Sequence, residues 1–212
     1  TAYGEAWDIL GTTTTGGGTG ESSNVAAVKL GSIGGTTANN TLSYNNSSLV
    51  DGLSVTASYL PSNGTQVESV TSLAVAYTGV EGLTVGFAVD ENGLSGTSGI
   101  DYETMYVKYA YGPVTVGYQE SSQDADGSTN DDEFTAMGIT YAVNESLSIG
   151  YTTSEYDDDN NTTDEESTSA NFSYTMGSMT LAGAFVTVDN QGGTSATVND
   201  TSGYALDLSF AF

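Results

Sequence analysis

Residues 203–212 read Gly-Tyr-Ala-Leu-Asp-Leu-Ser-Phe-Ala-Phe, and this stretch decides the fold class. Large apolar side chains stand at every second position, from Tyr204 to the aromatic Phe212. Small and polar residues, among them Asp207, fill the positions between them. Because successive side chains of a β-strand point to opposite faces, this alternation predicts a strand with one wholly apolar face.

The same alternation recurs along the chain from residue 39, and no helical period of comparable length is present. Most of the alternating segments have the length of a tilted strand that crosses a bilayer, about 9–11 residues. We therefore expect an all-β fold, a transmembrane antiparallel β-barrel whose apolar face contacts lipid. The expected strands, about eleven in number, are residues 39–45, 53–60, 67–77, 83–90, 101–111, 114–120, 133–142, 147–156, 167–176, 179–188 and 203–212.

The connections between these segments alternate in length. Short connections contain turn formers such as Asp51-Gly52 and Gly112-Pro113. The connections between them are mostly longer and polar. Short turns at one rim and long loops at the other are typical of an outer-membrane barrel. The long loops are expected at residues 61–66, 91–100, 121–132, 157–166 and 189–202.

Aromatic residues mark the ends of the strands that enter short turns, and the final strand also ends on one. Rings at equivalent heights on the apolar face are typical of the girdle at a membrane–water interface, where an amphipathic ring is most stable. The expected interface aromatics are Tyr44, Tyr77, Tyr111, Tyr141, Tyr174 and Phe212.

Composition excludes several classes of function. The chain has 27 acidic residues, two basic residues, no His and no Cys, and its net charge is −25. Nucleic-acid binding needs a basic surface, so it is excluded. The absence of His and Cys removes the common nucleophile–base pairs, and we expect no enzymatic activity.

Carboxylates concentrate in two of the expected loops. Asp124-Ala-Asp126-Gly resembles a calcium turn, but its spacing to a following Glu is not that of an EF-hand. The pattern leaves three interpretations open, namely a Ca²⁺ site in extracellular loops, diffuse cation binding, and simple solvation. No other cofactor is expected. The candidate ligands are Asp124, Asp126, Asp157, Asp158 and Asp159.

Three segments carry a resemblance to a known family: residues 40–44 (Asn-Thr-Leu-Ser-Tyr), 50–59 (Val-Asp-Gly-Leu-Ser-Val-Thr-Ala-Ser-Tyr) and 208–212 (Leu-Ser-Phe-Ala-Phe). With these segments the chain resembles the general porins of Gram-negative bacteria, especially the marine and alphaproteobacterial type. The terminal aromatic is similar to the signal that the barrel-assembly machinery reads in that family.

The resemblance implies a 16-stranded homotrimer in the bacterial outer membrane, in contact with the lipid bilayer and lipopolysaccharide. Counting back from the last strand, residue 39 begins the sixth strand. Residues 1–38 then take the place of the long loop that folds into the barrel and narrows the pore, and residues 39–212 form the barrel strands. On this interpretation the chain is the carboxy-terminal portion of a longer porin. The alternative is a complete barrel of ten or twelve strands.

The expected function is passive diffusion of small hydrophilic solutes with a preference for cations. Three alternatives remain at this point. They are a substrate-specific porin, an extracellular calcium-binding β-rich adhesin or surface-layer protein, and a soluble β-sandwich. The charged residues expected to set selectivity are Glu5, Asp8, Glu21 and Lys29 on the inward loop, and Glu68, Lys108 and Asp207 on the lumen-facing side of the strands.

Overall fold

The computed structural model describes residues 42–47, 49–62, 69–92, 99–125, 131–191, 193 and 200–211. Within these residues the chain forms one 11-stranded sheet in which every strand pairs antiparallel with its neighbour in sequence. The strands are β1 (Leu42–Asn46), β2 (Leu53–Leu60), β3 (Val70–Tyr77), β4 (Leu83–Asn92), β5 (Ile100–Tyr111), β6 (Val114–Ala125), β7 (Asp132–Ala142), β8 (Leu147–Asp158), β9 (Glu165–Met176), β10 (Met179–Asp189) and β11 (Thr201–Phe210).

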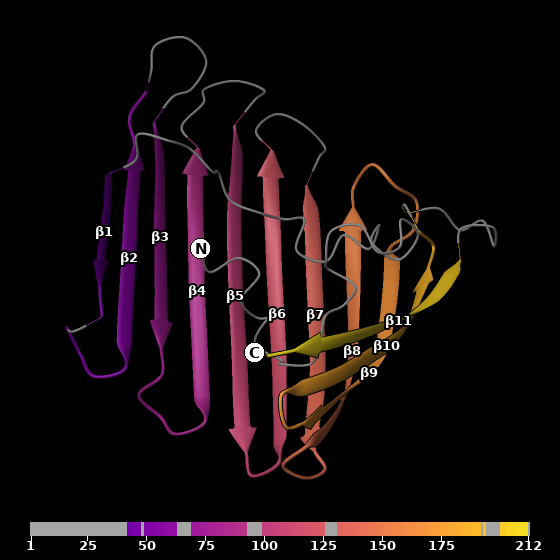
Figure 1. The fold of residues 1–212 in the computed structure, drawn as a ribbon. Coiled ribbons are helices and arrows are strands. Elements are labelled where there is room, and N and C mark those ends of the chain that lie inside the picture. Colours follow the sequence, from indigo (N-terminus) through magenta and orange to yellow (C-terminus); the bar gives the residue numbers. More distant parts are fainter. Residues whose placement is uncertain are drawn as a thin grey trace.

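The sheet is a curved wall, with β8 to β11 turned out of the plane of β1 to β7 (Figure 1). The all-β, antiparallel prediction is confirmed. Among the described residues no helix has the length and apolarity needed to cross a membrane. The expected inward loop, residues 1–38, lies outside the described residues, so the proposed domain boundary stays a prediction.

The register of the strands keeps the two faces of the wall chemically distinct. Opposite Val107 on β5 stand Val85 on β4 and Tyr118 on β6, so the apolar side chains form continuous rows across the sheet. Each favourable cross-strand pair contributes about 0.2–1 kcal/mol. The neighbouring residues Tyr106 and Lys108 project from the opposite side. We call the apolar side the outer face and the other side the inner face.

Burial in this sheet is the reverse of that in a water-soluble protein. The outer face exposes most of its large apolar side chains, including Tyr111 at 75% and Leu206 at 68%. Buried side chains belong to the inner face, where Phe134, Ala136 and Tyr156 form one cluster. A soluble β-sandwich would bury its apolar face, so that alternative is wrong.

Glycine is required at the short turns. Gly82, in the turn between β3 and β4, has a φ of +75°. A Cβ at this position would also collide with the carbonyl oxygen of Ala110. The carbonyl of Gly82 accepts a hydrogen bond from the backbone N–H of Ala110 at 2.8 Å, which joins the turn to β5. The short turns all lie at one edge of the wall, the turn end, and the longer connections lie at the loop end.

Several strands extend further toward the loop end than the sequence predicted. β6 continues to Ala125 and β8 to Asp158, so the placement of Asp124, Asp157 and Asp158 in loops was wrong. The prediction followed apolar alternation, which stops where side chains leave the lipid. Backbone pairing does not depend on apolar side chains, and β5 pairs with β6 past Asp101 and Asp124, as far as Ile100 opposite Ala125.

Candidate functional site

The inner face carries a network of hydroxyl and amide side chains. Thr104 Oγ1 and Ser121 Oγ share a hydrogen bond of 2.7 Å, and Gln119 Nε2 donates to Ser121 Oγ at 3.0 Å. Farther along the wall, Ser154 Oγ and Ser167 Oγ share another bond of 2.7 Å. All five residues are buried. Because buried polar groups that are bonded to one another are held in place, this part of the inner face is a fixed polar surface.

Carboxylates occupy the loop end of the inner face. Asp132 Oδ2 accepts hydrogen bonds from the hydroxyl of Tyr156 at 2.6 Å and from Gln123 Nε2 at 3.1 Å. The β7–β8 register sets Asp158 directly opposite Asp132, and the β8–β9 register sets Glu165 opposite Tyr156. These carboxylates therefore form a negatively charged group on one side of the wall.

On the inner face of β4 and β5, a tyrosine ring lies over a glycine. Gly86 on β4 pairs with Tyr106 on β5, and a Cβ at Gly86 would meet the ring carbons of Tyr106. Glycine is required here because the ring occupies the space of a side chain. On the same face, Asp90 Oδ1 accepts a hydrogen bond of 2.8 Å from Ser72 Oγ.

Of the predicted lumen residues, Lys108 and Asp207 lie on the inner face, by their pairing with Thr84 and Ala182 respectively. Lys108 is half-buried and is the sole basic side chain within the described part of the chain. Its cross-strand partner on β6 is Gly117, so no side chain stands directly beside Lys108 on that strand. Glu68 and the four residues predicted for the inward loop (Glu5, Asp8, Glu21 and Lys29) fall outside the described residues.

The predicted girdle residues that the structure describes, Tyr44, Tyr77, Tyr111, Tyr141 and Tyr174, all lie on the outer face. Their heights differ slightly. Tyr77 and Tyr111 are the last residues of β3 and β5, whereas Asn46 and Met176 stand closer to the turn than Tyr44 and Tyr174. The rings of Tyr109 and Tyr111 stack with their centroids 6.4 Å apart. Phe212 lies outside the described residues.

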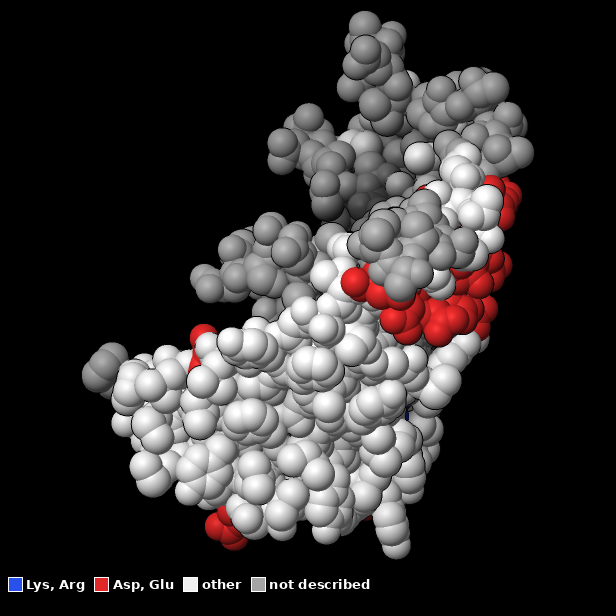
Figure 2. Space-filling model, turned by 90° about the vertical axis from the view of Figure 1, so that its right-hand side faces the viewer, with Lys and Arg blue, Asp and Glu red and all other residues white. Residues whose placement is uncertain are grey.

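An acidic rim at the loop end includes Asp124 and Asp157, which were expected in loops and lie in strands. Carboxylates follow directly above the apolar part of the outer face, and Figure 2 shows them gathered at one end of the molecule above a broad face without charged side chains. Several stand directly opposite one another across strands. These like-charge pairs are Glu133 with Asp157, Glu155 with Glu166, Glu166 with Asp189 and Asp101 with Asp124.

Like charges that face each other across strands oppose folding. Asp157, which lies above the apolar part of β8, shows the consequence. Desolvation and the negative charges of Asp164, Asp159 and Glu133 raise its pKa above the usual value of an aspartate. Within the described ranges, no group of three or more carboxylates is arranged to hold a metal ion. Asp126 lies outside the described residues.

Sequence reasoning missed Asp90, Asp132 and Tyr156 as inner-face residues. Along β5, the alternation counted from Tyr106 and Lys108 assigns the inner-face residues correctly. Asp132 and Tyr156 lie at strand ends next to expected loops, where the apolar pattern has faded. Their hydrogen bond joins residues 24 positions apart and depends on the pairing of β7 with β8.

A strand wall with an apolar, lipid-type outer face and a polar inner face is that of an outer-membrane channel protein. The family model described as Gram-negative porin matches residues 1–210, and the chain belongs to this family. It is therefore a protein of the bacterial outer membrane, from a family of channels rather than enzymes. This membership replaces the adhesin and surface-layer interpretation. No match was found among curated protein sequences.

Solved porins share the fold at low sequence identity. An anion-selective porin from Comamonas acidovorans is 16% identical, with a TM-score of 0.64, and the match covers 82% of this chain and 60% of that one. The trimer form of OmpT from Vibrio cholerae is 16% identical, with a TM-score of 0.56 and coverages of 96% and 72%. OmpF of Salmonella typhi, solved with daunomycin, is 16% identical, with a TM-score of 0.56, and the match covers 79% of this chain and 60% of that one. The chain thus spans 60% of the length of the Comamonas porin.

Proposed function

We propose that this protein forms a water-filled channel for passive diffusion of small hydrophilic solutes, with a preference for cations. The observation that carries the proposal is the division of every long strand between two environments. On β5, Val107 faces outward among apolar neighbours, whereas Thr104 and Lys108 face inward among polar ones. A wall that is apolar toward lipid and polar toward the inside suits an aqueous lumen.

The preference for cations follows from the charges of the inner face. Its loop end carries the carboxylates of Asp90, Asp132, Asp158 and Glu165, and Asp207 lies nearer the turn end. The one basic side chain that the structure describes is Lys108, so negative charge predominates on this face. A passive pore selects by radius and by the sign of the charge along its lumen. The related Comamonas porin is anion-selective by name, so the fold leaves the sign of selectivity to the side chains.

The test is the reversal potential of single channels in a planar bilayer with a KCl gradient. We expect a cation-selective potential, a stronger preference in Lys108→Gln and a weaker one in Asp158→Asn. Ser209→Asn on the inner face of β11 is the matched control and should leave the potential unchanged. An anion-selective potential would contradict the cation preference. Absence of conductance from folded protein would contradict the channel itself.

The proposal also names the residues that form the constriction of the channel. Glu5, Asp8, Glu21 and Lys29 belong to the segment that takes the place of the inward loop in the resemblance to general porins. We place them at the narrowest part of the lumen, facing Glu68, Lys108 and Asp207. Charge reversal at Glu5 or Asp8 should then change the reversal potential more than charge reversal at Glu145 in a short turn.

Assembly as a homotrimer is supported by the trimer form of the Vibrio cholerae relative. Trimers should insert into a bilayer with conductance steps in groups of three. Single, independent steps of uniform size from protein that sediments as a monomer would contradict this assembly.

For the acidic rim we propose diffuse association of cations rather than a coordinated Ca²⁺ ion. The support is the set of directly opposed carboxylate pairs, whose repulsion is relieved by any nearby cation. Calcium retention measured by equilibrium dialysis should disappear at high NaCl concentration. Retention that survives high salt would indicate a specific site.

A further inference from the structure

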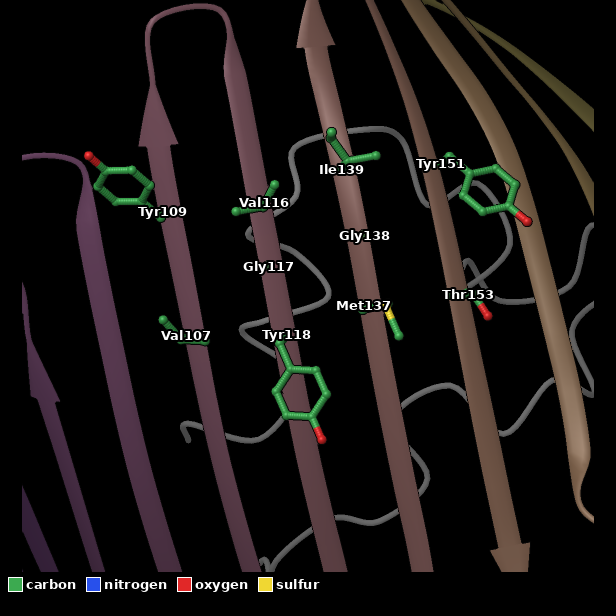
Figure 3. Close-up of a pocket in the computed structure, with 10 residues that line it drawn as sticks. All are labelled: Val107, Tyr109, Val116, Gly117, Tyr118, Met137, Gly138, Ile139, Tyr151 and Thr153. Atoms are coloured by element: carbon green, nitrogen blue, oxygen red, sulfur yellow. The ribbon is translucent and has the colours of Figure 1, made fainter.

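A hollow interrupts the outer face across β5 to β8, in the part of the wall that faces lipid (Figure 3). Its volume is about 440 Å³, and its lining is almost wholly apolar. Tyr109 and Tyr151 stand on either side of Val116 and Ile139, and Tyr118 lies farther toward the loop end. The hollow therefore has three ring-bearing margins and an aliphatic centre.

The register explains the shape. Tyr109, Val116, Ile139 and Tyr151 are successive partners in one row across four strands. The side chains of Val116 and Ile139 are shorter than those of the two tyrosines, so the row protrudes more from the sheet at its ends than in its middle.

Two glycines form the floor between this row and the next. Gly117 and Gly138 are direct partners on β6 and β7, and both line the hollow. At both positions the alternation of the strand directs a side chain toward the inner face, so on the outer side only backbone lies between the two rows. The hollow is formed by paired strands and does not depend on a loop.

The hollow is formed by two successive rows of outward-facing side chains, one with Tyr109 and Ile139 and the next, toward the loop end, with Val107 and Tyr118. Its margin on that side is formed by Tyr118 and Thr153. Toward the loop end, the next residues on the outer face are Glu120 on β6 and Glu155 on β8. The hydroxyl of Tyr118 donates a hydrogen bond to Glu120 Oε2 at 2.8 Å. The long loops of outer-membrane barrels are extracellular, so a group that enters the hollow from the polar margin comes from the outer leaflet.

We propose that this hollow is the binding site of one acyl chain of an outer-leaflet lipid, which remains with the protein through mild extraction. An apolar cavity of about 150 Å³ accommodates a benzene ring, so a trough about three times larger has room for a segment of acyl chain. The lining offers contact atoms on several sides, which a flat lipid-facing wall does not. Close van der Waals contact, rather than escape from water, distinguishes this chain from bulk lipid.

The alternative occupant is a second copy of this protein. An acyl chain is favoured because the hollow continues directly into the surrounding lipid-facing surface. At its loop-end margin, the apolar lining gives way to the tyrosine hydroxyl and carboxylates of the headgroup level. The inference depends on the location in the outer membrane and is independent of the selectivity proposed for the lumen.

The test is native mass spectrometry of the protein extracted from outer membranes in mild detergent. Val116→Trp fills the trough with a ring at a position that is 41% exposed. Leu73→Trp is the matched control, because Leu73 is 40% exposed on the outer face of β3, away from the hollow. We expect the wild type and Leu73→Trp to retain a lipid of defined mass, and Val116→Trp to lose most of it.

Retention by Val116→Trp equal to that of the control would overturn the proposal, as would a wild type that carries no lipid. A change of oligomeric state in Val116→Trp, with no lipid on the wild type, would assign the hollow to a contact between copies. Conductance of both variants, measured separately, reports on the channel. A failure of the lipid site is thereby distinguished from a failure of the proposed function.

Discussion

A single lysine placed on the outer face tests the orientation of the whole wall. Val107 is 38% exposed and lies four positions from Tyr111 at the turn end and four from Glu103 at the loop end of β5. At about 3.4 Å per residue and a tilt of about 40°, each boundary lies roughly 10 Å away along the membrane normal. Along β5, Val107 is thus near the middle of the apolar band.

Val107→Lys should therefore destabilise the folded protein strongly. A lysine near the bilayer midplane of an outer-membrane barrel costs about 2–4 kcal/mol. Since about 1.4 kcal/mol is a factor of ten, the folding equilibrium constant should fall by roughly 30- to 700-fold. Lys108, the next residue, is accommodated because it faces inward.

The assay is denaturant-dependent folding into lipid vesicles, followed by the gel mobility of the folded form. Thr140→Lys is the control, because Thr140 lies on the inner face of β7 and is only half-buried. It should cost much less than Val107→Lys. Equal losses in the two variants would refute the assignment of the outer face to lipid.

Three further perturbations test local features. Tyr156→Phe should lower the free energy of unfolding by about 1.5–3 kcal/mol, because a bond to a charged acceptor, Asp132, is lost; a melting temperature equal to that of the wild type would show that this bond is not stabilising. Gly82→Ala should destabilise by about 1 kcal/mol or more in chemical denaturation, through its φ of +75° and the carbonyl of Ala110, whereas the turn variant Val80→Ala should have little effect. The pKa of Asp157 is raised in the folded state, so its charged form is disfavoured there and stability is gained as pH falls through that pKa. The wild type should therefore gain more in melting temperature on mild acidification than Asp157→Asn, and identical gains would contradict the repulsion inferred at this site.

Much of the membrane part of the wall was predictable from sequence. Leu53 to Leu60 and Val114 to Tyr118 alternate so regularly that strand, face and environment follow from residue types alone. The observed ends of β2 agree with the predicted ones. Turn residues such as Gly82 and Gly112 carry equally local information, since both have positive φ.

The candidate site was less predictable, for two reasons. Asp132 and Tyr156 stand where the apolar alternation has ended, so nothing local separates a strand end from a loop there. Partner choice is also non-local. Neither the bond between these two residues nor the contact of Tyr106 with Gly86 can be counted off a single strand.

The sequence by itself determined the all-β class, the apolar and polar faces of each strand, and the membrane environment, because the direction of a side chain along a strand alternates residue by residue. Tertiary pairing decided which carboxylates face each other, how far β6 and β8 rise above the lipid, and where Val116 and Ile139 open a trough between two tyrosines. These features depend on register, which arises between segments far apart in the chain, and a shift of one residue would send each side chain to the other face.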